Sequence, residues 1–369
     1  MKKIKLLHIQ LLPLLSGVQN MMISLLSGLD QAKYDIYIIS KGDGPLVEKV
    51  KENGWTHIAV KDWDRNISLK DMLVAFHIYN ILKKIKPDIV HTHSSKPGFI
   101  GRIVAQKAKI PLVIHTIHGF PFHPYQNRAI SFFYQKLESY AANYAHHNVF
   151  VNNFEREYAI QKLGFEPEKS ITIYNAVQNM NIQKKEYNLH ERLEIVSVLR
   201  FWKQKNIVFT MKKAIEVVKK HKNVFFTFYG DGELLPECKK LITKSGVSDN
   251  IQLKGWCENI LFLLPKYDVF LLNSLWEGLS ISILEAMSVG LPIICSKIKG
   301  NTELVDSSNG WLINPLSDKE LKQCIEQIIT NKSILEEKGK DSIKKVTKLF
   351  RYELFIQSYK DLYENSKKQ

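Results

Sequence analysis

The stretch "YDVFLLNSLWEGLSISILEAMSVGLPIICS", from Tyr267 to Ser296, predicts a strand, a turn, a helix and a second strand. "YDVFLLNS" and "LPIICS" are short apolar runs typical of buried strands, and "SILEAMSVG" has helical spacing and closes at Gly290. Strand, helix and strand in this order form the repeating unit of a parallel sheet with crossover helices. The turn from Gly278 to Ser282 then lies at the helix start, where free backbone N–H groups form an anion site.

The same alternation continues on both sides of this unit. Strands are predicted at 4–10, 35–40, 56–60, 87–93, 111–117, 147–152 and 170–175, then at 193–200, 223–230, 251–256, 267–274, 291–296 and 310–315. Helices are predicted at 68–86, 127–145, 206–221, 232–246, 282–290 and 318–330. The fold class is therefore α/β, with doubly wound parallel sheets.

A polar stretch without periodicity, "QNMNIQKKEYNLHERLE", separates the two series of strands and predicts a linker. At 369 residues the chain has the length of two domains. We expect an N-terminal domain at 1–178, a C-terminal domain at 179–349, and a final helix in 350–369 that packs back on the first domain. The carboxyl ends of the two sets of strands would face each other across a cleft, where ligands bind.

The composition is that of an ordinary globular protein with a strong basic excess. The chain is 45% hydrophobic and 24% charged, and its net charge is +15. Such an excess favours phosphate-bearing partners: nucleotides, nucleic acid or anionic lipid. Residues 61–110 contain ten Lys or Arg against four Asp. This bias indicates either a solvated lysine-rich surface or a side that faces an anionic membrane, and the sequence leaves both open.

The sequence also bounds the compartment. The four cysteines are irregularly spaced, without a C-x-x-C pair, which favours a reducing compartment and neither zinc nor disulfides. The opening "MKKIKLLHIQLLPLLSG" is interrupted by Lys5, His8 and Gln10, so it is interpreted as a buried strand and its loop rather than a signal peptide. No apolar run is long enough to span a bilayer. We expect a cytoplasmic protein that at most lies on the inner face of the plasma membrane.

Two glutamates, Glu277 and Glu285, bracket the predicted turn. Ser282 stands three residues before Glu285, which is the spacing of a capping box, so Glu285 could simply cap its own helix. Glu277 lies before the turn, where capping does not require it. A carboxylate beside a phosphate site is unfavourable unless it accepts hydrogen bonds from ligand hydroxyls, and sugars and riboses supply such hydroxyls.

The E-x7-E pair within "EGLSISILEAMSVGLPII" resembles the signature of retaining glycosyltransferases of family 4, which have the GT-B fold of two Rossmann-like domains. Further segments resemble that family in the same order: "LSGVQNMM", "DIVHTHSSKPGFIGRIVA", "LVIHTIHGFPFH", "SVLRFWKQKN", "FYGDGELL" and "IQLKGW". The combination is most similar to bacterial enzymes that extend lipid-linked surface glycans such as capsule, exopolysaccharide or O-antigen repeats.

The resemblance implies roles for individual residues. Glu285 would accept the ribose hydroxyls of the nucleotide, and Glu277 would bind hydroxyls of the transferred sugar. Backbone N–H groups between them would meet the diphosphate or sugar, from Gly278, Leu279, Ser280, Ile281 and Ser282. Arg200 and Lys205 would neutralise the charge that the diphosphate gains as it leaves.

Three more residues match the family's motifs outside that turn. Gly17 stands where the family has a glycine-rich loop that lets the backbone approach the diphosphate. His118 matches a histidine that contacts the sugar or acceptor, and Gly230 matches a turn near the nucleotide base. Each has a plainer interpretation. Gly17 and Gly230 could serve only local backbone geometry, His118 could be a hydrogen-bonded strand-end histidine, and Arg200 and Lys205 could be surface residues.

Metal binding is not expected. Histidines stand near several strand ends, at His91, His93, His115, His118 and His123. They include no helix-borne H-x-x-x-H pair and no nearby set of carboxylates. The resemblance implies transfer without a metal or other cofactor, because basic side chains and a helix start would supply the positive field.

The resulting hypothesis is a retaining hexosyltransferase that uses a nucleotide-sugar donor, with UDP favoured, and a glycan or polyprenyl-diphosphate acceptor. A glycosidase is disfavoured because both carboxylates belong to one turn of one domain. Two alternatives stay open. One is a nucleotide-sugar epimerase of the same fold, against which "HTHSSKPGFIGRI" argues. The other is a basic, non-catalytic nucleic-acid-binding protein, for which no RNP, zinc-finger or helix-turn-helix pattern is present.

Overall fold

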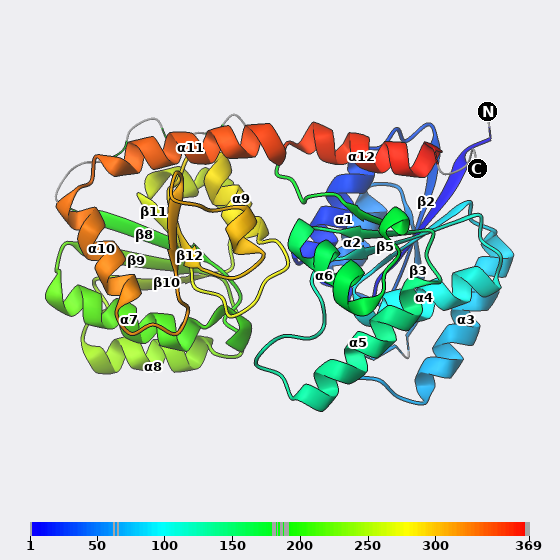
Figure 1. Cartoon of the computed structure of the whole chain (residues 1–369), viewed down its shortest axis with the longest axis horizontal. Coiled ribbons are helices and arrows are strands. Elements are labelled where there is room, and N and C mark those ends of the chain that lie inside the picture. Colours follow the sequence, from blue (N-terminus) through cyan, green and yellow to red (C-terminus); the bar gives the residue numbers. More distant parts are fainter. Residues whose placement is uncertain are drawn as a thin grey trace. The chain divides into compact units, whose positions relative to one another are not determined.

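The computed structural model describes residues 2–61, 63–64, 66–178, 182, 184, 187 and 192–365. The chain divides into two compact units, one formed by Met1–Asn175 with Glu353–Gln369 and the other by Ala176–Tyr352 (Figure 1). Much of the stretch predicted as a linker lies outside the described residues. Each unit is built around one parallel sheet with crossover helices, which confirms the predicted α/β class with two Rossmann-like domains.

The first unit contains a seven-stranded parallel sheet in the order β3-β2-β1-β4-β5-β6-β7. Its strands are β1 (Ile4–Ile9), β2 (Tyr34–Ser40), β3 (Thr56–Ala59), β4 (Ile89–His93), β5 (Leu112–Ile117), β6 (His147–Phe150) and β7 (Ser170–Thr172), and each overlaps a predicted strand. The order reverses between β1 and β4, which pair directly with His8 opposite His91. At such a switch point the loops from neighbouring strands run in opposite directions and leave room for a ligand.

Within the described residues, this unit has seven α-helices: α1 (Gly17–Ser27), α2 (Pro45–Glu52), α3 (Lys70–Ile85), α4 (Ser95–Lys107), α5 (Arg128–Ala142), α6 (Asn153–Leu163) and α12 (Tyr352–Asn365). Helices α3 and α5 both pack against α4. The side chain of Asn127 fixes the start of α5 by accepting a hydrogen bond from the backbone N–H of Ala129 at 2.8 Å. The final helix, expected from about Phe350, begins at Tyr352 and buries Tyr359 and Tyr363 within the first unit.

A buried ion pair joins α4 to α5. Arg102 is fully buried, and its Nη2 donates to Glu138 Oε2 at 2.8 Å while its Nε donates to the carbonyl of Gly98 at 2.9 Å. Because an unpaired charge in such a place is costly, the pair requires α4 and α5 to keep their mutual position. The only acidic residue of α5 is thereby already neutralised.

The second unit contains a six-stranded parallel sheet in the order β10-β9-β8-β11-β12-β13. Its strands are β8 (Leu193–Val198), β9 (Val224–Tyr229), β10 (Ile251–Gly255), β11 (Val269–Leu272), β12 (Ile293–Ser296) and β13 (Gly310–Ile313). Its helices are α7 (Ile207–Lys220), α8 (Leu235–Ser245), α9 (Ile281–Ser288), α10 (Glu320–Thr330) and α11 (Ile334–Leu349). The switch point lies between β8 and β11, the neighbouring strands that precede the predicted basic pair and the predicted glutamate turn.

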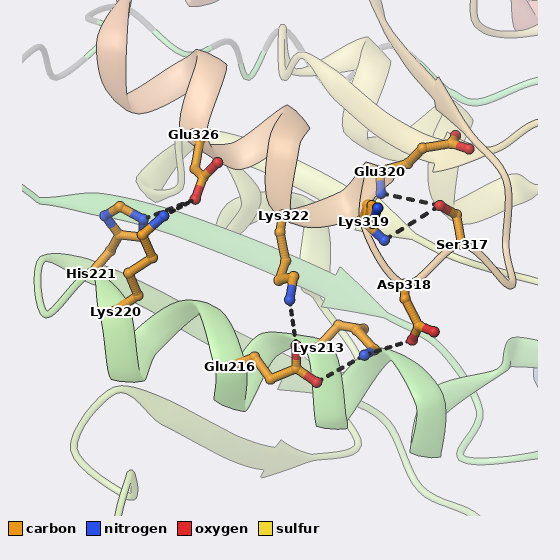
Figure 2. Close-up of polar contacts among 10 residues, drawn as sticks. All are labelled: Lys213, Glu216, Lys220, His221, Ser317, Asp318, Lys319, Glu320, Lys322 and Glu326. Carbon is orange, nitrogen blue, oxygen red and sulfur yellow. Dashed lines mark hydrogen bonds and ion pairs between the residues drawn. The ribbon is translucent and has the colours of Figure 1, made fainter.

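Ion pairs connect α7 with α10 and the loop before it (Figure 2). Lys213 contacts Asp318 at 2.7 Å, Lys322 contacts Glu216 at 2.6 Å, and Lys220 contacts Glu326 at 2.6 Å. The Lys322–Glu216 and Lys220–Glu326 pairs are exposed, where such contacts add little stability, whereas the Lys213 side chain is only 11% exposed and its partner Asp318 is 75% exposed. The three pairs join α7 to α10 and to the loop before it.

None of the helices in the described ranges combines the length and the apolar character needed to cross a membrane.

Candidate active site

The predicted site residues follow the carboxyl ends of strands in both units. Those of the second unit follow three adjacent strands: Arg200 and Lys205 follow β8, Gly230 follows β9, and the segment Glu277–Glu285 follows β11. Those of the first unit are Gly17, after β1, and His118, after β5. Because neighbouring parallel strands end at one edge of their sheet, the loops of each set share that edge.

The turn after β11 ends two residues earlier than predicted. Helix α9 begins at Ile281, and the hydroxyl of its N-cap residue, Ser280, accepts a hydrogen bond from the backbone N–H of Ile283 at 3.4 Å. The capping-box interpretation of Glu285 is therefore wrong, because Ser282 lies inside the first helical turn. Of the two serines, Ser280 has the extended backbone conformation that an N-cap needs.

The turn itself is consequently Gly278, Leu279 and Ser280, and Ile281 and Ser282 belong to the helix start. The first backbone N–H groups of a helix have no acceptor within the helix, and the helix dipole adds positive potential there. This end of α9 can therefore bind an anionic or hydroxyl-bearing ligand through backbone groups.

Lys205 and Glu277 form an ion pair between Lys205 Nζ and Glu277 Oε1. The two side chains are 17% and 9% exposed, so the pair is largely buried. Lys205 ends a short 3-10 helix, Lys203–Lys205, that follows β8. An ammonium group has three N–H donors and a carboxylate has about four acceptor positions, so both groups keep capacity for a ligand.

Backbone contacts hold the same two loops together. The backbone N–H of Leu275 donates to the carbonyl of Gln204 at 2.8 Å, and Gln204 Nε2 donates to the carbonyl of Trp276 at 2.8 Å. The loop after β8 and the loop after β11 are thus fixed on each other before any ligand binds. Sequence reasoning missed Gln204, because its contact joins positions 72 residues apart and no local pattern marks it.

The bulky "FWK" segment after Arg200 is accommodated by burial and stacking. Phe201 is fully buried, and the guanidinium of Arg200 lies 5.0 Å from the ring centroid of Trp202. The backbone N–H of Phe201 donates to the carbonyl of Asp231 at 2.9 Å. This contact ties the loop after β8 to the "GDG" turn after β9.

Gly230 is required by a close backbone approach. Its φ is +131°, and a Cβ atom there would lie 1.8 Å from the carbonyl oxygen of Leu199. Gly300 is similar, since a Cβ atom would lie 1.9 Å from the carbonyl oxygen of Gly278. These approaches explain both glycines without a ligand, so the assignment of Gly230 to nucleotide binding stays a prediction.

Glu285 lies on α9 and is only partly exposed. Burial raises the pKa of its carboxyl from 4.5 to about 7. No side chain in the described part of the chain donates a hydrogen bond to this carboxyl group. A half-buried carboxyl without a protein partner is suited to bind ligand hydroxyls.

His118 ends a buried chain of hydrogen bonds in the first unit. His118 Nε2 lies 3.1 Å from His93 Nδ1, and His93 Nε2 lies 2.8 Å from His8 Nδ1. His91 Nδ1 lies 2.7 Å from the hydroxyl of Tyr363 on α12. Burial lowers the pKa of His118 to about 4 and that of His8 to about 3, so these imidazoles stay neutral near pH 7 and exchange hydrogen bonds without carrying charge.

The nitrogens of His8, His91 and His93 lie within 4.8 Å of one another, a spacing that could hold a metal ion. However, both ring nitrogens of His91 already have partners, Tyr363 and Thr116. No carboxylate belongs to this group. Sequence reasoning left His8 out. The usual Rossmann strand order, which places the first strand beside the fourth, is the signal that would have found it.

The remaining predicted positions lie as follows. Gly17 is the first residue of α1, after the N-cap residue Ser16, so it belongs to a helix start rather than to an open loop. His115 is buried beneath α4, where its Nδ1 lies 2.9 Å from the hydroxyl of Thr92. A Cβ atom on Gly98 would lie 2.2 Å from the His115 ring, which explains the glycine in α4.

Comparison with known proteins covers both units. Residues 15–179 match the family described as Glycosyltransferase Family 4, and residues 179–348 match the family described as Glycosyl transferases group 1. The chain is 35% identical, over 98% of its length and 97% of the relative's, to the UDP-Gal:alpha-D-GlcNAc-diphosphoundecaprenol alpha-1,3-galactosyltransferase of Escherichia coli. It is 22% identical, over 86% of its length and 88% of the relative's, to the N,N'-diacetylbacillosaminyl-diphospho-undecaprenol alpha-1,3-N-acetylgalactosaminyltransferase of Campylobacter jejuni.

Solved structures share the fold at low sequence identity. Anabaena HepE in complex with UDP and glucose has a TM-score of 0.80 at 16% identity, covering 97% of this chain and 99% of that one. TarM has a TM-score of 0.80 at 15% identity, covering 98% and 99%. The two-unit architecture is therefore that of these proteins.

Proposed function

The chain belongs to the glycosyltransferases of the GT-B fold, with a family 4 segment followed by a group 1 segment, and from this premise we propose that it transfers a sugar from a UDP-sugar to a polyprenyl-diphosphate-linked glycan with retention of anomeric configuration. The observation that carries the proposal is the arrangement at the carboxyl edge of the second sheet. There the Lys205–Glu277 pair, the start of α9 and the carboxyl of Glu285, which has no side-chain partner among the described residues, follow two adjacent strands.

Each group has a proposed task in binding the donor. Glu285 accepts the ribose hydroxyls, Glu277 accepts hydroxyls of the transferred sugar, and the backbone from Gly278 to Ser282 meets the diphosphate. Arg200 and Lys205 place positive charge where the diphosphate leaves. The Lys205–Glu277 pair keeps both side chains oriented before the donor arrives, so little ordering cost remains on binding.

In the proposed transfer, the bond between the anomeric carbon and the diphosphate oxygen breaks, and its electron pair stays on the diphosphate. The acceptor hydroxyl attacks from the same face and gives its proton to the departing diphosphate. Arg200, Lys205 and the start of α9 stabilise the charge that develops on the diphosphate, which lowers the barrier because this charge exists only as the bond breaks. No metal or other cofactor is part of this proposal.

The acceptor and the place of action follow from the same premise. The relatives from Escherichia coli and Campylobacter jejuni are named for undecaprenol-linked substrates, so we place the acceptor at a membrane surface, on its cytoplasmic side. Neutral His118, at the carboxyl edge of the first sheet, would donate to or accept from a sugar or acceptor hydroxyl. The basic charge of the chain suits the anionic surface.

A transfer assay tests the proposal. The purified full chain is incubated with a polyprenyl-diphosphate-linked N-acetylhexosamine and either UDP-galactose, UDP-N-acetylgalactosamine or UDP-glucose, and the product is analysed by mass spectrometry and NMR. We expect one donor to give an α-linked product. A β-linked product would contradict retention, and no product from these donors, together with no binding of UDP, would contradict the donor assignment.

A further inference from the structure

Exposed apolar side chains concentrate on two helices of the first unit. Among the described residues, sixteen large hydrophobic side chains are exposed, and ten of them lie in residues 67–76 and 125–140. These ten are Ile67, Leu69, Met72, Leu73, Phe76, Tyr125, Ile130, Phe132, Phe133 and Tyr140, and we name them the α3/α5 surface. Single exposed hydrophobics are ordinary, but a gathering of this kind marks a surface that binds something.

The stripe on α3 has the spacing of one helix face. Leu69, Met72, Leu73 and Phe76 recur at three and four residues and are 88%, 74%, 72% and 66% exposed. The opposite face of the same helix, with Val74 among its buried residues, packs into the core. The start of α3 is therefore apolar on both faces, and its stability does not require the outer one.

The two helices lie on the same side of the first sheet, because both pack against α4 (Figure 1). Each also follows a strand, so its N-terminal half lies toward the carboxyl ends of the strands. The apolar residues belong mainly to those N-terminal halves. The α3/α5 surface thus lies toward the edge of the sheet that carries His118 and Gly17.

The charges around the α3/α5 surface are positive. Exposed Lys70 and Arg128 lie on the N-terminal halves that carry it, exposed Lys136 lies near the middle of α5, and three further exposed lysines, Lys83, Lys84 and Lys86, lie at the C-terminal end of α3. The exposed carboxylate of Asp64, before α3, is paired with Lys41 at 2.7 Å. The only acidic residue of α3, Asp71, forms an ion pair with Lys96 at 2.6 Å, and the only acidic residue of α5, Glu138, is buried against Arg102. Neither helix therefore contributes a free carboxylate to balance these cations.

We propose that the α3/α5 surface docks the protein on an anionic lipid bilayer, with Leu, Met and Phe side chains inserted at the level of the headgroups and the lysines in contact with lipid phosphates. An amphipathic helix with aromatic and leucine side chains on one face and lysines beside them is suited to this position. The surface of a second copy would carry the same positive charge and repel it. The inference rests on the proposed function in one respect: a lipid-linked acceptor lies in such a bilayer.

Sedimentation with vesicles tests the docking. The full chain is mixed with vesicles of phosphatidylcholine alone or of phosphatidylcholine with phosphatidylglycerol, and the pelleted fraction is measured. We expect binding to the anionic vesicles, and Leu73→Ser with Phe76→Ser should weaken the partition coefficient by about tenfold or more, because burial of such side chains is lost. The pair Lys83→Glu with Lys84→Glu should also bind more weakly than the unaltered protein. This difference should grow as salt is lowered, because charges are then least screened.

Matched variants in the second unit serve as controls. Phe262→Ser removes an aromatic side chain that is 55% exposed, and Lys239→Glu with Lys240→Glu reverses an exposed lysine pair. Both controls should pellet as the unaltered protein does.

Wild-type protein that stays in the supernatant with anionic vesicles would overturn the proposal, and so would serine variants that pellet normally. A wild-type dimer that the serine variants convert to a monomer, without vesicle binding, would instead assign the surface to contact between copies. Binding of UDP, measured on the same samples, should not change, which separates failure of docking from failure of the proposed function.

Discussion

The ion pair between Lys205 and Glu277 predicts that stability and activity respond differently when its members are removed one at a time and together. The variants are Lys205→Met, which keeps the aliphatic stem, Glu277→Gln, and the double variant. Each single change leaves one largely buried group without its partner, because the side chains are 17% and 9% exposed. The free energy of unfolding of the second unit should fall by about 2 to 3 kcal/mol, somewhat less than for a fully enclosed pair, since solvent reaches one edge.

The double variant should recover most of this loss, because neither charge is then left unpaired. Transfer activity should not recover. Each single variant should lower kcat by about a hundredfold or more, since an interaction with the developing charge or with the sugar is lost, and the double variant should stay as low.

Urea unfolding and a transfer assay on the four proteins measure the two effects. In thermal unfolding the single variants should lower the Tm by roughly 4 to 10 °C. Lys203→Met is the matched control, because Lys203 lies on the same 3-10 helix but is exposed. Stability losses that simply add in the double variant would refute the ion pair, and wild-type kcat in Lys205→Met would refute its role in transfer.

Three further changes give distinct expectations. Gly230→Ala should lower the unfolding free energy of the second unit by more than about 2 kcal/mol, because its Cβ would meet a backbone carbonyl. Gly246→Ala should lower it by only about 1 kcal/mol, because its Cβ would lie in open space and only the left-handed backbone conformation, with φ +65°, is unfavourable. Burial raises the pKa of Glu285 from 4.5 to about 7, so the native state binds the proton more tightly than the unfolded chain. The stability that this group contributes is therefore present below pH 4.5 and is lost as pH rises to about 7. Glu285→Gln should remove that decline of the unfolding free energy in urea unfolding, and equal pH slopes for the variant and the unaltered protein would contradict the buried carboxyl. Tyr363→Phe should lower the unfolding free energy of the first unit by about 1 to 3 kcal/mol, because His91 loses a buried hydrogen bond, and an unchanged urea midpoint would contradict the bond.

The sequence predicted the elements well because their signals are local. Apolar runs of four to eight residues identified every strand in the two sheets. Gly290, predicted to close its helix, directly follows the C-cap residue of α9, Val289. Local signals are ambiguous where two residues offer the same chemistry. Ser280 and Ser282 can both cap a helix, and only the backbone conformation chose Ser280.

Contacts between distant positions could not be read from the sequence. Nothing near Lys205 indicates that its partner is Glu277, 72 residues on, and nothing near His118 indicates that its imidazole ends a chain of buried histidines. The periodicity of 68–86 predicted one buried face for α3, but the apolar residues at its start lie on two faces, and only exposure in the folded chain reveals the second.

Isothermal calorimetry of the full chain with UDP, GDP and ADP tests the central claim, that the carboxyl edge of the second sheet is a nucleotide-sugar donor site. The account predicts saturable binding of UDP in preference to GDP and ADP, weakened at least about tenfold in Glu285→Ala by the loss of hydrogen bonds to the ribose. Absence of UDP binding, or equal binding by Glu285→Ala, would contradict the account.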